Sequence, residues 1–247
     1  MKIRHIATAI FLFCFYSTAN AQVRIGLKAG LNMAQVSFSD DISDAWENED
    51  TLFGLEYRML PAFHVGIQAE FDFTPKLGIG IGLQMSGKGY RSGGEFSTPF
   101  PKKDFSYSLK STPLYVQAPV NFYLRTHGFF AAVGGYVGLG MSGNHSTTAK
   151  VDDTETTDEF ELEFTDKYDP ILEDNPAANY SPLDYGASVE LGYELSRFRI
   201  SASYQFGLAN TFSKEYVEVN EKLGFDVQGR HRVIGVSVAY LFGGGIE

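Results

Sequence analysis

The sequence predicts an all-β fold: an eight-stranded, antiparallel, up-and-down β-barrel that spans a membrane, preceded by a cleavable signal peptide. Three observations favour this class. Apolar and polar residues alternate with period two in eight segments. The connections between these segments alternate between short and long, and the N-terminus has the composition of an export signal. We therefore expect a signal peptide over residues 1–21 and a single barrel domain over residues 22–247.

The N-terminal segment carries the three parts of a secretory signal. Lys2 and Arg4 precede an apolar run over residues 6–16, and Ala19-Asn20-Ala21 has the small-x-small pattern of a cleavage site. The apolar run is too short to cross about 30 Å of hydrocarbon as a helix. Cys14 is the only cysteine, so we expect the mature chain, from Gln22, to contain neither a disulfide nor a reactive thiol.

The eight alternating segments are the expected strands. In the second, Phe63, Val65 and Ile67 alternate with His64 and other polar residues, and the other segments repeat this pattern. Each is close to the 9–11 residues that a tilted membrane strand needs. Pro119 lies inside the fourth segment, where we expect a local bulge or a missing hydrogen bond. The segments cover residues 23–33, 63–73, 77–86, 114–124, 129–141, 183–195, 198–208 and 234–242.

The connections distinguish the two ends of the barrel. Short turns at 74–76, 125–128 and 196–197 alternate with long connections over residues 34–61, 87–112, 143–182 and 211–231. This alternation is typical of outer-membrane barrels. A soluble β-sandwich or lipocalin-like barrel also alternates, but there the outer face is polar, whereas here the face opposite the apolar one is rich in glycine and charge. An even strand number puts both termini on the short-turn side, expected to be the periplasm, with the long loops outside the cell.

The polar face of the strands should line the lumen. An eight-stranded barrel is just wide enough for side chains to fill, so the charged residues there are expected to form ion pairs. A narrow ion or proton path is the alternative, and the small bore argues against passage of metabolites. The expected lumen network comprises Arg24, Lys28, Glu70, Asp72, Glu190, Glu194 and Arg199, with Asp184 also facing inward.

Neither catalytic nor cofactor-binding residues are predicted. Glu190 and Glu194 would lie about 13 Å apart along one strand, which is outside the separations that glycosidases use. Ser142, His145 and Asp152 share one rim without a recognisable motif, and no metal-binding motif such as His-Glu-x-x-His occurs. We therefore expect no enzymatic activity, no metal site and no cofactor.

Charge gathers in the long connections. The chain carries a net charge of −10, and near −12 without Lys2 and Arg4, which argues against a nucleic-acid partner. Residues 144–182 carry a net −9 and residues 34–58 a net −6, whereas residues 91–110 carry about +2. Three interpretations stay open: a solvated acidic crown, divalent cations bridging loops to each other or to lipopolysaccharide phosphates, and a protein-binding surface. The expected protein-binding anchors are Trp46, Phe160, Phe164 and Tyr168.

Alternation continues into two of the long connections. Residues 53–59 and 160–164 keep period two, which predicts strands that extend past the membrane and form a protruding β-rim. The exposed edge of such a rim could recruit a partner strand.

Three segments carry a resemblance to a known family. Residues 61–71, with Phe63-His64-Val65-Gly66, and residues 114–120, with Tyr115 before Pro119, resemble the second and fourth strands of the PorT-like outer-membrane β-barrel family of the Bacteroidetes. Residues 233–242 resemble that family's closing strand, and Gly235, Val238 and Tyr240 fit the pattern read by the barrel-assembly machinery. The resemblance covers residues 22–243.

The resemblance and the pattern together give a set of expected functions. The leading expectation is an outer-membrane barrel with a structural or partner-binding role through its acidic loops. The resemblance implies a second role, as an accessory component of type IX protein secretion, and a narrow ion channel is the third. The expected partners are outer-membrane lipid and lipopolysaccharide, the barrel-assembly machinery, and a secretion-system or surface protein.

Overall fold

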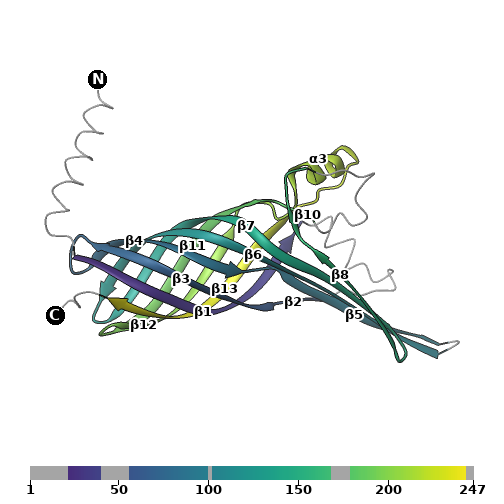
Figure 1. Ribbon diagram of the computed structural model, residues 1–247, viewed down its shortest axis with the longest axis horizontal. Helices are drawn as coiled ribbons and strands as arrows, with labels where there is room; N and C mark the ends of the chain where they lie inside the picture. The colour runs from purple at the N-terminus through teal and green to yellow at the C-terminus, as the bar shows by residue number, and fades with distance from the viewer. Residues whose placement is uncertain (1–21, 40–55, 100–101, 168–178, 243–247) are drawn as a thin grey trace, which may run out of the picture.

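The computed structural model describes residues 22–39, 56–99, 102–167 and 179–242. Antiparallel strands dominate these residues, and Figure 1 shows them as a tilted barrel with a sheet projecting from one end. The expected signal peptide, residues 1–21, lies outside the described residues. None of the described helices is long and apolar enough to cross a membrane.

Eight strands close into a ring. Each pairs with the next one around the ring, and the last pairs with the first in a register that puts Leu27 opposite Tyr240. The eight predicted segments coincide with these strands, with only Phe73 and Leu208 one residue beyond the ends of β3 and β12, which confirms the eight-stranded, up-and-down ring. In spatial order the strands are β1 (Gln22–Phe38), β3 (Leu60–Asp72), β4 (Leu77–Gly87), β6 (Lys102–Thr126), β7 (Phe129–Val151), β11 (Leu183–Leu195), β12 (Phe198–Gly207) and β13 (Gly229–Phe242).

The prediction of eight strands was too low for the sheet as a whole. Three more strands join it: β2 (Glu56–Arg58), β5 (Tyr90–Pro99) and β8 (Thr154–Glu161). Two short strands, β9 (Glu163–Phe164) and β10 (Asn179–Tyr180), form a separate parallel pair. β2, β5 and β8 lie in connections rich in glycine and charged residues. Few of their positions are apolar, so the alternation of apolar and polar residues that predicts a strand is incomplete there.

The apolar face of the ring points outward. Leu31 is 69% exposed and Met141 62%, whereas Arg24 and Glu70 on the alternate face are buried. The ring is thus inverted relative to a soluble barrel, since its continuous outer surface is apolar and its interior is polar. Such a surface is stable when hydrocarbon covers it and a liability in water.

Aromatic residues mark both borders of the apolar band. At the short-turn end Phe129 packs edge-on against Tyr193, with ring centroids 4.9 Å apart, and Phe198 against Tyr240 at 5.1 Å. At the other end the guanidinium of Arg232 lies 3.7 Å from the ring centroid of Phe206. Phe198 and Phe206 lie eight residues apart on β12, about 26 Å by the strand rise, which matches an apolar band roughly 25 Å tall.

Pro119 interrupts one ladder, as expected. On the β4 side the pairing passes from Ile81–Val120 to Gln84–Gln117 without pairing Pro119. On the β7 side Pro119 keeps its register opposite Tyr136, and the bulge lies instead at Leu114 and Tyr115. The proline therefore removes pairing without shifting the strand.

The short turns lie at one end of the barrel together with both ends of the described chain. Gln22 pairs with Asp72 beside the turn between β3 and β4, and Phe242 pairs with Ile25 on the neighbouring strand. Figure 1 shows the start of β1, in purple, and the end of β13, in yellow, on this side. We call it the turn end, and the opposite side the loop end.

At the loop end β6 and β7 continue past the ring. Residues 102–113 of β6 and 143–151 of β7 pair with each other, flanked by β5 and β2 on one side and by β8 on the other. We call this five-stranded sheet the β-wing. Twelve residues of β6 span about 40 Å at the usual rise. Strands thus extend past the ring, as predicted, but mainly in β6 and β7: residues 53–55 lie outside the described residues, and residues 160–164 are divided between β8 and β9.

A helix that the sequence analysis did not predict lies between β12 and β13. Helix α3 (Lys214–Lys222) begins after Ser213, whose side chain accepts a hydrogen bond from the backbone N–H of Tyr216. Its first turn carries Glu215 and its last turn Lys222, the charge order that the helix dipole favours. Figure 1 shows it beside the loop end of the barrel.

Two neighbouring glycines of β7 test the packing of the ring. A Cβ added at Gly134 would lie 1.9 Å from the carbonyl oxygen of Val120, whereas one at Gly135 would meet only the Gly186 oxygen, at 3.1 Å. We expect Gly134→Ala to lower the free energy of unfolding by about 1–3 kcal/mol, the usual cost of overpacking, and Gly135→Ala to have a smaller effect. Urea titration of the refolded barrel in micelles measures both, and equal losses would contradict the inward crowding at Gly134.

Candidate functional site

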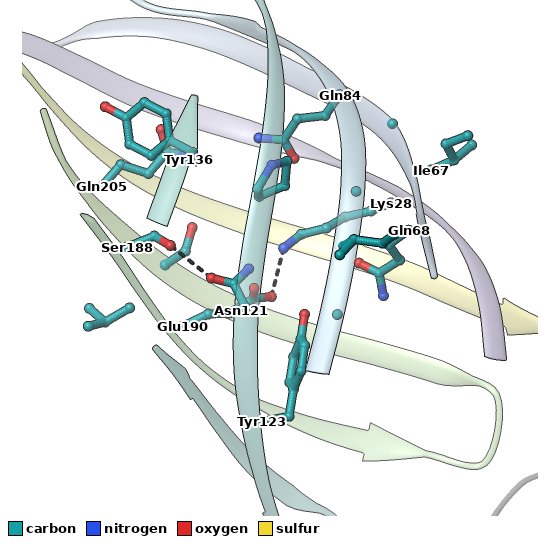
Figure 2. A pocket seen from close by; sticks show the side chains of 17 residues that line it. Lys28, Ile67, Gln68, Gln84, Asn121, Tyr123, Tyr136, Ser188, Glu190 and Gln205 are labelled. Carbon is teal, nitrogen blue, oxygen red and sulfur yellow. Dashed lines mark hydrogen bonds and ion pairs between the residues drawn. The ribbon is translucent and has the colours of Figure 1, made fainter. Parts of the chain in front are cut away.

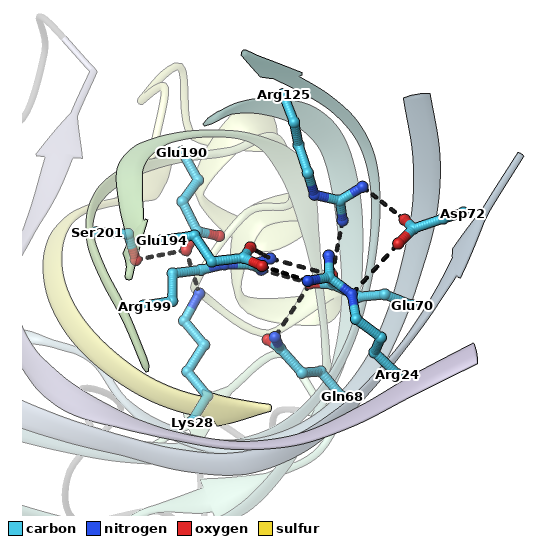
Figure 3. Close-up of polar contacts among 10 residues, drawn as sticks. All are labelled: Arg24, Lys28, Gln68, Glu70, Asp72, Arg125, Glu190, Glu194, Arg199 and Ser201. Atoms are coloured by element: carbon cyan, nitrogen blue, oxygen red, sulfur yellow. Dashed lines mark hydrogen bonds and ion pairs between the residues drawn. The ribbon is translucent and has the colours of Figure 1, made fainter. Parts of the chain in front are cut away.

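The turn end of the lumen holds six charged side chains in one network. They come from five strands: Arg24 from β1, Glu70 and Asp72 from β3, Arg125 from β6, Glu194 from β11 and Arg199 from β12. We call them the arginine cluster. Figure 3 shows the three guanidinium groups converging on Glu70.

Glu70 is the centre of this cluster. Its carboxylate accepts from Nη2 of Arg24 at 2.9 Å, from Nη2 of Arg125 at 2.7 Å and from Nη2 of Arg199 at 3.0 Å. Its side chain is fully buried. A carboxylate can accept several hydrogen bonds and a guanidinium donates in a fixed plane, so three arginines around one carboxylate form a rigid hub.

The remaining carboxylates complete the charge balance. Asp72 accepts from Arg125 at 2.5 Å and lies 3.2 Å from Nε of Arg24. Glu194 pairs with Arg24, and it accepts from Arg199 at 2.7 Å. Three cations therefore meet three anions inside the ring, and no net charge is left to attract an ion from the solvent.

A second ion pair lies deeper in the barrel. Nζ of Lys28 lies 2.8 Å from Glu190, which also accepts from the Ser201 hydroxyl at 2.5 Å. Beside it is a cavity of about 40 Å³ lined by polar side chains, among them Gln84, Asn121 and Gln205 (Figure 2). This volume holds one or two water molecules, so it is a polar gap in the packing and much too small for a metabolite.

The loop end of the lumen contains a third buried pair. Nζ of Lys88 lies 2.6 Å from Asp184 and 4.1 Å from the ring centroid of Tyr136. Both charged side chains are almost fully buried. Nearby, His64 bridges Asn32 and Ser237 through its two ring nitrogens, at 2.8 and 2.9 Å.

Aromatic side chains cover the lumen above Lys88. Phe164 packs between Tyr115 and Tyr180, with ring centroids 5.5 and 6.2 Å away. The Tyr180 hydroxyl lies 2.6 Å from the Ser111 hydroxyl, and burial raises the pKa of Tyr180. His145, next to this layer on β7, has its pKa lowered by burial. The described residues thus fill the lumen at both ends.

The seven predicted lumen residues all lie inside the barrel. Five belong to the arginine cluster, and Lys28 and Glu190 form the neighbouring pair. Sequence reasoning missed Arg125 and Lys88. Arg125 keeps the inward parity of Tyr115 and Tyr123, so extending the strand by one residue would have found it. Lys88 lies between two glycines outside any alternating run, so only the closed ring places it inside.

The predicted protein-binding anchors of the loops differ in their surroundings. Phe160 on β8 is 38% exposed. Phe164, four residues farther along, packs instead against Tyr115 and Tyr180, next to the buried Leu162. Trp46 and Tyr168 lie outside the described residues.

The residues weighed for chemistry do not converge. His145 and Asp152 lie seven residues apart on an extended segment, about 23 Å by the strand rise, and Asp152 accepts from the backbone N–H of Asp104. Glu190 and Glu194 pair with different cations. Within the described residues there is no group of three or more His, Cys, Asp or Glu side chains that could hold a metal.

A closed ring with an apolar exterior and a paired polar interior defines an integral membrane β-barrel. Residues 15–213 match the family model described as the outer membrane protein beta-barrel domain, and the chain belongs to this family. Its place is therefore the outer membrane.

Comparison with solved structures gives further outer-membrane barrels. The attachment invasion locus protein Ail of Yersinia pestis is 11% identical, with 90% of this chain and 99% of that chain covered and a TM-score of 0.36. Neisserial surface protein A is 10% identical, with 88% and 97% covered and a TM-score of 0.38. OprG of Pseudomonas aeruginosa is 15% identical, with 91% and 98% covered and a TM-score of 0.32. The comparison with curated proteins found no match.

Removing the charge of Glu70 tests the arginine cluster. Glu70→Gln keeps the side-chain shape but leaves three guanidinium groups facing two carboxylates. We expect it to lower the free energy of unfolding by about 3–5 kcal/mol, the cost of breaking a buried ion pair. Glu155→Gln, on the exposed strand β8, is the control and should change stability by less than about 0.5 kcal/mol. Circular dichroism during denaturant titration measures both, and a neutral Glu70→Gln would show that the cluster does not hold the ring together.

Proposed function

We propose that this chain is a non-enzymatic outer-membrane barrel that binds a protein partner through the β-wing, with the barrel as its rigid anchor. In this proposal the loop end faces outward from the cell and both termini lie in the periplasm. The observation that carries it is the β-wing itself. It is a sheet projecting about 40 Å, with one face rich in aromatic and aliphatic residues and an edge strand, β8, whose outer side no described strand pairs with.

The two faces of the β-wing differ in chemistry. Phe105, Tyr107 and Leu109 of β6 share one face, and the cross-strand register puts Val151 and Phe160 on it too. The opposite face carries hydroxyl and charged side chains from the alternate positions. A one-sided apolar sheet that projects from a barrel is a surface for a partner, since solvent alone gives no reason to place aromatic residues there.

The free edge of β8 supplies the backbone groups for such a partner. Leu162 donates to the Gly143 carbonyl oxygen at 2.8 Å, which fixes the hydrogen-bonded pairs between β7 and β8. The N–H groups of Glu155, Thr157 and Glu159 therefore point away from β7. A partner that adds a strand at this edge would bond to these groups, the mode of β-augmentation.

The charge of β8 defines which partner fits. Glu155, Glu159 and Glu161 lie on one face of the strand, and only Glu155 has a lysine, Lys150, opposite it on β7. An added strand with Lys or Arg at alternate positions would place cations beside these glutamates. Apolar side chains at the alternate positions of the added strand would lie on the face of Phe160, which on β8 also carries Thr154, Thr156 and Asp158.

Proline substitution separates the edge from the rest of the β-wing. Thr157→Pro removes one N–H from the free edge and leaves the bonds to β7 in place, since proline is tolerated when its nitrogen faces solvent. Thr157→Val is the matched control and keeps the N–H. A peptide of alternating Lys and Val should bind the full-length protein in nanodiscs at least tenfold more weakly after Thr157→Pro than after Thr157→Val, because its backbone bonds are lost.

The measurement is fluorescence anisotropy of that peptide, repeated with an alternating Glu and Val peptide. Equal binding by the two threonine variants would rule out strand addition at β8. Equal binding of the acidic and basic peptides would rule out the charge match.

A PorT-like accessory role in type IX secretion is a second proposal, favoured by the resemblance at residues 61–71 and 114–120. A filled lumen excludes passage of a folded cargo through the barrel, so such a role would be that of a scaffold. Deletion in the native host, followed by proteomics of secreted and outer-membrane fractions, tests it. We expect type IX cargo to accumulate in the periplasm if this role holds, and secretion to stay intact if the chain is only a surface-binding barrel.

The ion-channel alternative has less support. The arginine cluster blocks the turn end, and the layer of Tyr115, Phe164 and Tyr180 blocks the loop end. A conducting path would need both to move.

A further inference from the structure

A row of three cations crosses the base of the β-wing. Arg58 on β2 lies directly opposite Arg91 on β5, and Arg91 lies directly opposite Lys110 on β6. Directly opposite residues have Cα atoms about 4.5–5.5 Å apart. Like charges in this position destabilise a sheet. Arg58 has other contacts, and Glu56 lies two residues before it on β2, so the repulsion that still needs a nearby anion is that between Arg91 and Lys110.

Within the described residues, that anion is not an acid paired to Arg91 or Lys110. Neither side chain forms an ion pair there, and both are exposed. The same row continues to Ser146 on β7 and reaches an acid only at Glu159 on β8, two strands beyond Lys110. Along β5, the nearest acid is Glu95, four residues or about 13 Å from Arg91.

The row lies just outside the apolar band of the barrel. Lys110 shares the outward face of β6 with Leu114, four residues or about 13 Å away along the strand. The neighbouring outward residues Phe63 and Met141 are 53% and 62% exposed and belong to the apolar surface. A cation four strand residues beyond that apolar surface lies at the level of lipid headgroups.

A groove connects the cations to the apolar surface. It has a volume of about 530 Å³, and its walls include Phe63, Leu114, Met141 and Leu162, with Lys110 at its rim. A second hollow, of about 480 Å³, lies against Arg58 and Arg91 and includes the hydroxyls of Ser106 and Ser108 together with Glu95. The lining also contains two carboxylates, Glu161 in the groove and Glu95 in the second hollow. Its apolar walls below and its cations with hydroxyls above match a lipid with an anionic head.

The groove has a structural cause. β4 ends at Gly87, and the chain crosses to β5 through Lys88 and Gly89. Gly89 has a φ of +119°, and a Cβ added to it would lie 1.9 Å from the Ser111 oxygen, so this position requires glycine. The ladder between β3 and β4 ends at His64 and Ser86, and Gly87, which lies against Ala62 and Phe63, is the last residue of β4. The groove lies where this ladder ends, between β3 and the base of the β-wing.

We propose that this groove and cation row bind a phosphorylated lipid of the outer leaflet. Its phosphate lies between Arg91 and Lys110, with Arg58 alongside, and one acyl chain lies in the groove. The proposal shares with the proposed function the outward orientation of the loop end. It does not depend on the free edge of β8.

The test measures binding of a bisphosphorylated lipid A to the full-length protein in phosphatidylcholine nanodiscs. Each headgroup cation contributes about a fivefold factor in affinity, so we expect Arg91→Gln/Lys110→Gln to bind about 25-fold more weakly. Lys103→Gln/Lys150→Gln removes the same charge farther out on the β-wing and is the matched control, expected to bind like the wild type. Ser142→Trp, which adds bulk in the groove, should weaken binding without changing the charge.

The remaining arms identify the source of the phosphate. Dephosphorylated lipid A should bind the wild type and Arg91→Gln/Lys110→Gln with the same affinity. Inorganic phosphate at the same concentration should not displace phosphorylated lipid A from the wild type. Competition by inorganic phosphate would overturn the lipid assignment in favour of a free anion. Equal loss in both double variants would show a general effect of net charge and overturn the site, while leaving the Thr157→Pro comparison unaffected.

Discussion

The Glu70 carboxylate and its three arginines set the limits for the rest of this barrel. Arg24, Arg125 and Arg199 come from β1, β6 and β12, so a single acid on β3 connects strands that are not all neighbours in the ring. A buried charge is tolerable only when its partners are fixed. The ring must therefore close in one register, since a slip of one residue would turn these side chains toward lipid.

The same requirement explains where the ring gives way to the β-wing. Inside the ring, every strand has two neighbours, as a bilayer demands of backbone groups. Beyond Gly87 that rule no longer holds: β5 takes the place of β4 beside β6, and β8 pairs on one side only. Open edges are acceptable in water and excluded in hydrocarbon. The place where edges appear therefore marks where the bilayer ends.

Much of the fold could be predicted because alternation is a local signal. The outward positions of Phe63 and Leu31, and the inward positions of Arg24 and Glu70, follow from parity alone once a strand is recognised. The gap at Pro119 followed from its missing N–H. What parity could not give is the partner of each charge, because the side chains meet across the lumen from strands far apart in the sequence.

The missed features share a different cause. Lys88 lies inside the barrel because Gly87 and Gly89 let the chain cross between strands, and a single residue between glycines carries no period. Phe164 looked like an exposed anchor because it alternates with acids, yet its ring packs between Tyr115 and Tyr180 at the loop end of the lumen. Helix α3 was missed because it is short and polar, with no buried residue to give it an apolar face. Its start depends on one capping contact, from Ser213 to the N–H of Tyr216.

The filled lumen limits what the interior of the barrel can bind. Its buried charges are paired with one another, so they offer no binding group to a solute. The six charged groups at the turn end hold their strands in fixed positions, which makes the barrel rigid. Rigidity matters most for a surface that must hold its shape at a distance, and the β-wing continues from two ring strands, β6 and β7, with the bulge at Leu114 and Tyr115 where β6 leaves the ring. Its pairing extends unbroken from Leu114 to Phe105 on the β7 side. In the proposed function the interior of this protein is a support, and the groups offered to a partner lie outside the ring, on the edge of β8 and at the base of the β-wing.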